Sequence, residues 1–499
     1  MARLTKSDAI TAVTLAAGFV AAVFVRTWRL TPHARIPDTY EHMSATRRLL
    51  SGEFPLSDLY PPGVALVLAP FFAIFPDTVT TVQAAVVLFS LVLIALAYVT
   101  ARRAGADTVT TLIFTAAIAF SPAFVTMSRV GLFDAIGTAL LVASIVAAPS
   151  AAKARWPAWL AFALLLSVAI TVRSTNVFVL PAVMITYADL GRDGARMQRL
   201  RAHVTSPPAL VIGLLTCALF LLLAIPGLIS GSSNPVNFAF GDVPQHVLFY
   251  QVVAFGGFAL PMVAVLLAFG VSPLWRRAPS LVLVAIYLLI VWPVAHAPFP
   301  FVNERYMLLP WFFTLLIAVH GPIEVWRSTR DAQSPFRALR RATGITAQFL
   351  IVALFAVGVF QTLSTWPDDV GLSDESALEE LRPVVASFDD DALIITALAR
   401  GFDHARDDRA YLDLIDHRIE MRDRSSSVAE IVATIEQALD DRRAVYYVYS
   451  RFEEAGENAG LGGDGLDIYF TGVEARFRVS EMFRAQQPEY RIYRVTQPP

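Results

Sequence analysis

Long apolar runs restrict most strongly what this chain of 499 residues can fold into. A helical run of about 20 mostly apolar residues matches the hydrocarbon thickness of a bilayer. Eleven such runs lie near residues 8–27, 79–100, 108–127, 131–149, 156–173, 176–190, 208–230, 247–270, 279–296, 305–321 and 343–363. The run 63–75 is shorter and follows Pro61-Pro62, so we expect a juxtamembrane or re-entrant helix there. The sequence therefore predicts a mainly α-helical polytopic membrane protein with about eleven transmembrane helices.

Charged residues divide the chain into two parts of opposite sign. From Trp366 to the end there are 28 acidic and 15 basic residues, a balance of −13, whereas residues 1–365 have 14 acidic and 25 basic residues, a balance of +11. Such a split is typical of two bodies in two environments. We expect a transmembrane domain over residues 1–365, with a first outer loop at 28–78, and a soluble domain over residues 366–499.

Basic residues in alternate loops predict the orientation, because cytoplasmic loops are enriched in arginine and lysine. With the N-terminus inside, the inner loops contain Arg102, Arg103, Lys153, Arg155, Arg192, Arg196, Arg199, Arg201, Arg276, Arg277, Arg327, Arg330, Arg337, Arg340 and Arg341. An odd number of spans then puts residues 366–499 on the other side. The N-terminal 28 residues have a basic end and a long apolar core, which favours an uncleaved span. We expect a multi-pass plasma-membrane protein with a cytoplasmic N-terminus and an extracytoplasmic C-terminal domain.

The acidic tail alternates strand-like and helix-like segments. The segments "ALIITAL", "AVYYVYS" and "YRIYRV" are short and rich in β-branched or aromatic residues, which favours strands. The segment "SSVAEIVATIEQALDD" has apolar residues at helical spacing after a serine start. Strands interspersed with helices predict a small α/β domain.

Cysteine and histidine usage indicates neither a disulfide nor a metal centre. Cys217 is the single cysteine, which excludes an internal disulfide and a cysteine metal cluster. The histidines of the outer loops, His33, His42, His246 and His296, lack the spacing of a metal site. We expect no cofactor and no metal, although a divalent ion near Asp38 is left open.

The first outer loop is the most polar part of the N-terminal third. Asp38-Thr-Tyr-Glu41 has the pattern of a capping box, and the helix it starts is expected to run to about Leu50 and end at Gly52. An aspartate held at a helix start is also well oriented and stays ionised, as a general base must. The capping and catalytic interpretations of Asp38 are compatible, and both stay open here.

Four motifs occur together in the chain: an Asp that opens a loop helix, the following Tyr60-Pro61-Pro62-Gly63, and the segments 119–145 ("AFSPAFVTMSRVGLFDAIGTALLVASI") and 299–319 ("FPFVNERYMLLPWFFTLLIAV"). This combination resembles the polyprenyl-phosphate-sugar glycosyltransferases of the GT-C fold, which include protein O-mannosyltransferases and lipid A aminoarabinose transferases. Many relatives have Asp-Glu where this chain has Asp38-Thr39, so a pair of carboxylates is not implied.

The resemblance implies an inverting transfer of a sugar from a polyprenyl-phosphate donor to an acceptor hydroxyl of a protein, a lipid or a cell-envelope glycan, with Asp38 as base. The leaving phosphate needs a cation, and arginine suits phosphate because of its planar donor fork. Among the donor phosphate-binding candidates Arg305, Arg129 and Arg173, Arg305 ranks first because it occupies the family's Arg-Tyr position. The substrate-binding candidates are Glu41, Asp58, Tyr60, Asp134 and Tyr306. Membrane lipids, but no nucleic acid, are the other expected partners.

Each candidate also has an ordinary structural interpretation. Arg305 suits a membrane-edge anchor or a partner of Glu304. Asp134 and Arg173 suit pairing with each other or with Arg129.

Other polar residues of the first loop have ordinary interpretations too. Arg47 and Arg48 suit a solvated helix face, and Tyr60 suits an interfacial belt.

Two other classes of function compete with the enzyme. A transporter or lipid-linked-sugar flippase is compatible with eleven spans, yet transporters concentrate polar groups at mid-bilayer, often in repeated halves. A non-catalytic anchor for the tail leaves the polar loop unexplained.

Overall fold

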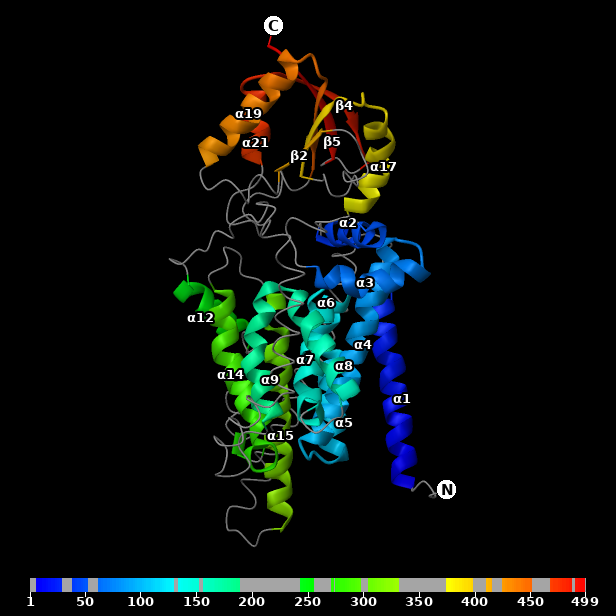
Figure 1. Cartoon of the computed structure of the whole chain (residues 1–499), viewed down its shortest axis with the longest axis vertical. Coiled ribbons are helices and arrows are strands. Elements are labelled where there is room, and N and C mark those ends of the chain that lie inside the picture. Colours follow the sequence, from blue (N-terminus) through cyan, green and yellow to red (C-terminus); the bar gives the residue numbers. More distant parts are fainter. Residues whose placement is uncertain are drawn as a thin grey trace.

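The computed structural model in Figure 1 consists of a helical bundle and, at one end, a smaller part that contains a β-sheet. The N-terminus lies near the opposite end of the bundle. The structure describes residues 6–28, 38–52, 62–129, 133–151, 156–188, 243–254, 271–272, 274–297, 304–331, 374–397, 410–414, 424–450, 467–486 and 490–498.

Most of the longer helices of the bundle run along its long axis (Figure 1). The bundle includes α1 (Lys6–Thr27), α4 (Val79–Arg103), α5 (Thr108–Phe120), α6 (Pro122–Arg129), α7 (Asp134–Ala151), α8 (Trp156–Thr171), η1 (Ser174–Val179), α9 (Leu180–Tyr187), α12 (Val243–Ala254), α14 (Pro279–His296), η4 (Glu304–Met307) and α15 (Leu308–Asp331). Three of the described helices, α4, α7 and α14, are long and apolar enough to cross a bilayer, and α5 with α6 makes a fourth crossing if counted as one bent span. The expected number of eleven is not confirmed, since the runs 208–230 and 343–363 lie outside the described residues.

The expected span 108–127 is not one straight helix. It breaks into α5 and α6, which are inclined by 45° to each other. Ser121 adopts an extended conformation with ψ of 132°, as expected for a residue that precedes a proline, here Pro122. The break is therefore a local effect of the Ser-Pro step, which the apolar run alone does not reveal.

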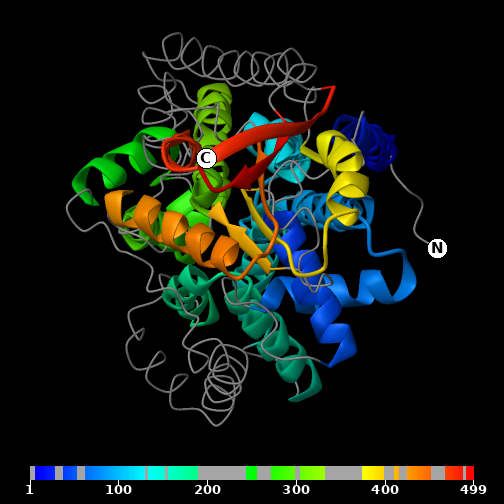
Figure 2. The same cartoon turned by 90° about the horizontal axis from the view of Figure 1, so that it is seen from above.

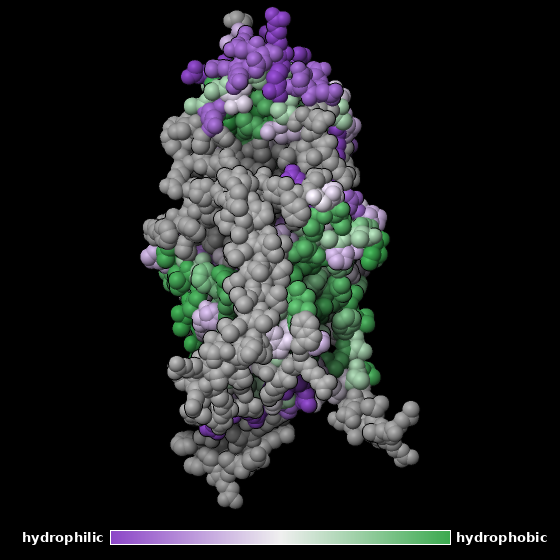
Figure 3. Space-filling view, in the orientation of Figure 1, coloured by the Kyte–Doolittle hydropathy of each residue, from purple (hydrophilic) through white to green (hydrophobic). Residues whose placement is uncertain are grey.

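Apolar side chains cover the outside of the bundle as well as its interior. The exposed large apolar residues of α1 and α14 are Val13, Phe19, Val20, Phe24, Ile286, Ile290 and Val294. Figure 3 shows apolar residues gathered along the bundle and hydrophilic ones over the sheet-containing part. An apolar outer surface of this extent is typical of helices that face lipid.

Two short helices lie across the end of the bundle that faces the sheet (Figure 1). The first, α2 (Asp38–Ser51), ends at Gly52, whose φ of +80° is accessible to glycine, so the expected bounds are confirmed. The second, α3 (Gly63–Ile74), has 12 residues, about 18 Å of helix and too short for a crossing. A Cβ atom at Gly63 would lie 2.3 Å from the carbonyl carbon of Thr171. Glycine is therefore needed where α3 begins against the end of α8.

The C-terminal part is built on a five-stranded sheet with the strand order β2-β1-β3-β5-β4. Its strands are β1 (Leu393–Thr396), β2 (Ala410–Asp413), β3 (Val445–Tyr449), β4 (Arg478–Arg484) and β5 (Arg491–Thr496). Strand β1 pairs in parallel with β2 and β3, while β5 pairs antiparallel with β3 and β4. The segments "ALIITAL", "AVYYVYS" and "YRIYRV" are thus strands β1, β3 and β5.

Helices cover both faces of this sheet. They are α17 (Asp374–Ala386), α19 (Arg424–Asp440) and α21 (Asp467–Glu474). On one face Ile395 and Tyr447 pack with Ile435 of α19, and on the other Ile394 packs with Leu381 of α17. Figure 2 shows α17 and α19 on opposite sides of the strands. A parallel strand buried on both faces is expected to be apolar throughout, as the Leu-Ile-Ile of β1 is.

Candidate functional site

An aspartate and two arginines meet at the end of the bundle that faces the sheet. The Asp134 Oδ1 atom lies 2.9 Å from Arg173 Nη2, and its Oδ2 atom lies 3.6 Å from Arg305 Nε. The three residues come from distant parts of the chain. We call them, together with Tyr306, the arginine cluster.

Helix ends position every member of the arginine cluster. Asp134 is the first residue of α7, where the positive end of the helix dipole stabilises a carboxylate. Arg173 directly precedes η1 in an extended conformation, with φ of −153° and ψ of 137°. Arg305 and Tyr306 lie in η4, immediately before α15. Because these breaks lie at one end of the bundle, their side chains converge there.

The charges of the cluster do not cancel. The side chain of Asp134 is only 8% exposed, whereas Arg173 keeps 30% of its side-chain surface exposed. One carboxylate between two guanidinium groups leaves a net charge of +1 for the three side chains. A partly buried excess positive charge favours an anionic ligand, and guanidinium forks match phosphate oxygens.

Tyr306 supports both arginines through its ring. The Cζ atom of Arg173 lies 4.3 Å from the ring centroid, and that of Arg305 lies 5.4 Å from it. Both distances are within the range of a cation–π interaction. In this geometry the tyrosine ring orients both guanidinium groups, and the substrate contact expected of Tyr306 stays a prediction.

A buried histidine lies behind the Tyr306 ring. The centroids of His296 and Tyr306 are 4.9 Å apart, and His296 is 1% exposed. His296 Nδ1 donates to the carbonyl oxygen of Trp292 at 2.9 Å, so this nitrogen is protonated. Its Nε2 lies 3.0 Å from Thr175 Oγ1, two residues after Arg173. His296 thereby connects the segments that carry Arg173 and Tyr306.

Sequence reasoning noted His296 as a loop histidine and assigned it no role. The signal that could have found it is its spacing in α14, four residues after Trp292, which places both on one helix face. Trp292 Nε1 donates to the carbonyl oxygen of Tyr306 at 2.7 Å. The two side chains therefore fix both the backbone and the ring of Tyr306.

Arg129 contacts a different part of the molecule. Its Nη2 donates to the carbonyl oxygen of Trp28 at 3.0 Å, and the residue is 3% exposed. Nearby, the buried Arg26 of α1 donates to Ser90 Oγ at 2.8 Å and to the carbonyl oxygen of Ala119 at 2.7 Å. These two arginines tie the end of α1 to the broken span α5–α6. Asp134 pairs with Arg173, as one interpretation expected, and the role of Arg129 as a phosphate ligand stays a prediction.

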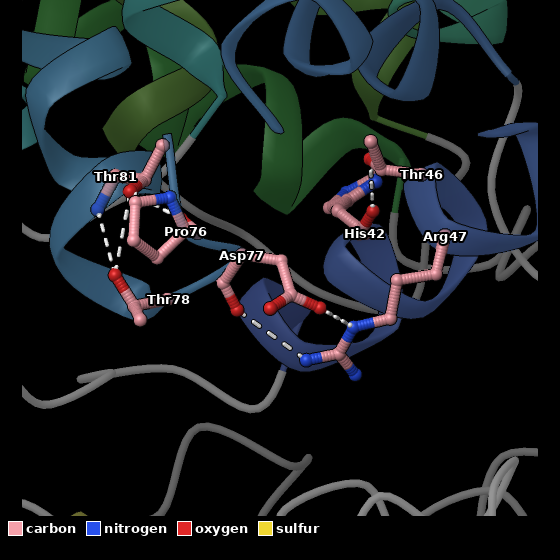
Figure 4. Close-up of polar contacts among 7 residues, drawn as sticks. All are labelled: His42, Thr46, Arg47, Pro76, Asp77, Thr78 and Thr81. Atoms are coloured by element: carbon pink, nitrogen blue, oxygen red, sulfur yellow. Dashed lines mark hydrogen bonds and ion pairs between the residues drawn. The ribbon is translucent and has the colours of Figure 1, made fainter. Parts of the chain in front are cut away.

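The polar helix α2 is docked onto the bundle through its own side chains. Figure 4 shows Arg47 reaching Asp77, whose Oδ2 atom lies 2.6 Å from Arg47 Nε. Asp77 precedes α4, which Thr78 caps by accepting from the amide of Thr81. Arg47 is therefore paired rather than simply solvated, and the pair joins α2 to the start of α4.

Helix α2 contacts the residue that precedes Asp134 of the arginine cluster. His42 is buried, and its ring lies 4.1 Å from that of Phe133, the residue before Asp134. Asp38 begins α2 one turn before His42, and Glu41 lies in the first turn. The candidates Asp58 and Tyr60 lie outside the described residues. The structure thus brings together Asp134, Arg173, Arg305 and Tyr306, and places the helix that Asp38 opens next to them.

Metal ligands do not gather in the described part of the chain. Within it, no three His, Cys, Asp or Glu side chains lie close enough to hold a metal ion. The chemistry available in the cluster is the binding of an anion by guanidinium groups.

One third of the chain is similar to a known protein family. Residues 60–223 match the family model of dolichyl-phosphate-mannose-protein mannosyltransferases. No curated protein matches the chain in sequence.

The fold is similar to that of ArnT from Cupriavidus metallidurans. The apo structure has a TM-score of 0.62 at 13% sequence identity, covering 99% of this chain and 100% of that one. The structure bound to undecaprenyl phosphate has a TM-score of 0.60 at 14% identity and covers 100% of both chains. The oligosaccharyltransferase of Archaeoglobus fulgidus has a TM-score of 0.54 at 10% identity, covering 96% of this chain and 72% of that one.

These matches confirm the resemblance to GT-C glycosyltransferases. The chain has their fold, and its described residues include three helices, or four with the bent pair, that are long and apolar enough to cross a membrane.

Proposed function

We propose that the protein is an integral membrane glycosyltransferase that moves a sugar from a polyprenyl-phosphate donor to an acceptor hydroxyl. The observation that carries this proposal is the arginine cluster: two guanidinium groups share one buried carboxylate and rest on Tyr306. The fold adds support, because ArnT, which has a similar fold, has been solved with undecaprenyl phosphate bound.

Arg305 and Arg173 bind the donor phosphate in this mechanism. When the bond between the sugar carbon and the phosphate oxygen breaks, its electron pair goes to that oxygen. The two guanidinium groups stabilise this developing charge, the task for which preorganised cations are most effective. Asp134 holds both arginines in place, so the site does not need to reorganise during the reaction.

Asp38 acts as the general base. The acceptor oxygen attacks the sugar carbon from the face opposite the phosphate, which inverts its configuration, and its proton goes to the Asp38 carboxylate. The position of α2 supports this role. Asp38 lies four residues, about 6 Å of helix, before His42, which contacts the residue preceding Asp134. Glu41, Asp58 and Tyr60 then remain candidates for acceptor binding.

The reaction takes place on the outer face of the plasma membrane. The arginine cluster and α2 lie at the end of the bundle that faces the sheet, whereas Arg102, Arg103 and Arg276 belong to the opposite end. Under the positive-inside rule that opposite end is cytoplasmic. Residues 1–365 then form the membrane domain, and residues 366–499 form an extracytoplasmic domain without catalytic residues. A reporter fused after Pro499 that is active only in the cytoplasm would reverse this orientation.

The test uses the purified full-length protein in proteoliposomes, radiolabelled polyprenyl-phosphate sugars and a membrane extract as a source of acceptor. We expect label transfer by the wild type, and a loss of about a hundredfold for Arg305→Gln and Arg173→Gln, because each removes a cation at the leaving group. Arg276→Gln is the matched control, since Arg276 is an exposed arginine at the other end of the bundle. If label crosses the membrane without joining an acceptor, the protein is a flippase and the proposal fails.

A further inference from the structure

A cavity with two arginines lies at the end of the bundle away from the sheet. It encloses about 280 Å³ between the ends of α4, α7 and α9 and the start of α14. Its polar lining consists of Thr100, Arg103, Ser150, Thr186, Arg277 and Ser280. Because α7 begins at Asp134 and ends at Ala151, the cavity and the arginine cluster lie at opposite ends of one helix.

Contacts with neighbouring helices hold the arginines at the cavity. Arg103 donates to the carbonyl oxygen of Val146 and, at 3.1 Å, to Ser150 Oγ, which places its guanidinium over the end of α7. The stem of Arg277 packs over Gly105, where a Cβ atom would lie 3.7 Å from Arg277 Cδ. The described lining contains two arginines and no acidic residue.

The start of α14 adds to this positive potential. Ala278, the residue before α14, and Ser280 line the cavity and are buried. The N-terminal end of a helix carries a partial positive charge, which favours anions, while Pro279 at the first position of α14 has no N–H group to donate. Two guanidinium groups, four hydroxyl groups and a helix start thus converge on one space.

The neighbouring residues indicate that the cavity lies at the depth of lipid headgroups. Trp275 is 40% exposed and Arg276 beside it is exposed. Tryptophan and arginine concentrate at the membrane–water interface. A basic space between transmembrane helices at this depth suits an anionic headgroup.

We propose that this cavity binds a phosphate ester group, supplied by an anionic phospholipid of the leaflet on the side opposite the sheet. The volume supports a headgroup, since about 280 Å³ is just below the usual range for sites that enclose a whole small molecule. The acyl chains would lie outside, along the apolar surface of the bundle. A soluble phosphate ester has the same recognition chemistry, so the experiment separates the two sources.

The experiment measures lipid binding by the full-length protein in a neutral detergent, using native mass spectrometry, and needs no sugar substrate. The wild type is expected to retain phosphatidylglycerol and to bind phosphatidylcholine at least about tenfold more weakly, because phosphatidylcholine has the same phosphate diester but also a quaternary ammonium group, which the two arginines repel. Arg277→Gln should weaken phosphatidylglycerol binding at least about tenfold. The control Arg276→Gln, an exposed neighbour outside the cavity lining, should weaken it by no more than about fivefold. Arg277→Lys should recover part of the binding.

Three results would overturn the proposal. Equal binding of phosphatidylglycerol and phosphatidylcholine would show that the cavity does not recognise an anionic headgroup. Equal losses of phosphatidylglycerol affinity in the Arg277→Gln and Arg276→Gln variants would show that binding depends only on general surface charge. Inorganic phosphate or glycerol 3-phosphate that displaces the lipid at millimolar concentration assigns the cavity to a soluble ligand. If Arg277→Gln fails to fold, Ser150→Glu replaces it, because a carboxylate at the lining should repel the phosphate.

Discussion

The two ends of the helical bundle use arginine in different ways. At the end that faces the sheet, Arg173 and Arg305 share the buried carboxylate of Asp134 and rest on an aromatic ring. At the other end, Arg103 and Arg277 line a cavity with hydroxyl groups, and no described lining residue is acidic. Counting basic residues distinguishes the two ends of the bundle only by how many arginines each end has. Their described neighbours differ: at one end a carboxylate holds two guanidinium groups in one geometry, whereas at the other the described polar neighbours in the cavity lining are hydroxyl groups.

The largest effect is expected from Asp134→Asn, which removes the charge that separates two guanidinium groups. Loss of one member of a buried ion pair is expected to cost about 3 kcal/mol of stability. Transfer activity should fall as well, because Arg173 and Arg305 lose their common anchor. Thermal or denaturant unfolding in detergent, beside an activity assay, measures both effects.

Asp77→Asn is the matched control for this prediction. It removes a carboxylate whose side chain is 41% exposed, compared with 8% for Asp134. Equal losses of stability in the two variants would mean that burial does not distinguish the pairs, and the contrast between a fixed cluster and ordinary ion pairs would fail.

Asp38→Asn is expected to have the next largest effect, on turnover alone. Asparagine caps a helix about as well as aspartate, so the start of α2 should stay intact. An amide cannot accept the acceptor proton, so turnover should fall about a hundredfold or more, while donor affinity changes little. Turnover and donor affinity are compared at equal amounts of folded, membrane-inserted protein. Retained turnover would leave Asp38 as a cap and shift the search for the base to Glu41 or Asp58.

Tyr306→Leu should have a smaller effect, on donor binding. A cation–π contact contributes about 1 kcal/mol, so loss of the ring should raise the Kd for the donor about fivefold. Tyr306→Phe keeps the ring and is expected to retain most of the affinity. If the two variants lose affinity equally, the hydroxyl group rather than the ring is responsible, and Tyr306 contacts substrate as the sequence analysis expected.

Local features of the fold follow from the sequence more closely than the contacts of the site do. The helix α14 has the expected bounds, and α2 ends at Gly52, because these limits depend on neighbouring residues. The expected span 305–321 continues as α15 to Asp331, since polar residues can extend a helix beyond its apolar run. The break at Ser121 was missed because its cause is one Ser-Pro step inside an apolar run.

The sequence selected Asp134, Arg173, Arg305 and Tyr306 individually, yet it left open whether Asp134 pairs with Arg173 or with Arg129. That choice depends on the rotation of each helix end. The inclination of α6 by 45° to α5 is part of this geometry, with Arg129 at the end of α6 bound to the Trp28 carbonyl group. His296 was unassigned because its partners Thr175 and Tyr306 are distant in the chain. Contacts between residues that are distant in the chain depend on how the helices pack against each other, which the sequence of each segment alone does not show.

The smallest effect is expected from Arg47→Gln, which breaks the ion pair between α2 and the start of α4. Arg47 and Asp77 keep 22% and 41% of their side-chain surfaces exposed, so water screens the pair. Exposed pairs contribute about 0.2–1 kcal/mol, and we expect a coupling in this range from a double-mutant cycle of Arg47→Gln and Asp77→Asn. The buried contact of His42 with Phe133 should keep α2 in place, so turnover should fall less than about threefold. A coupling as large as the one between Asp134 and Arg173 would contradict this prediction. The position of α2, and with it Asp38, would then depend on an exposed ion pair rather than on its apolar contact with the bundle.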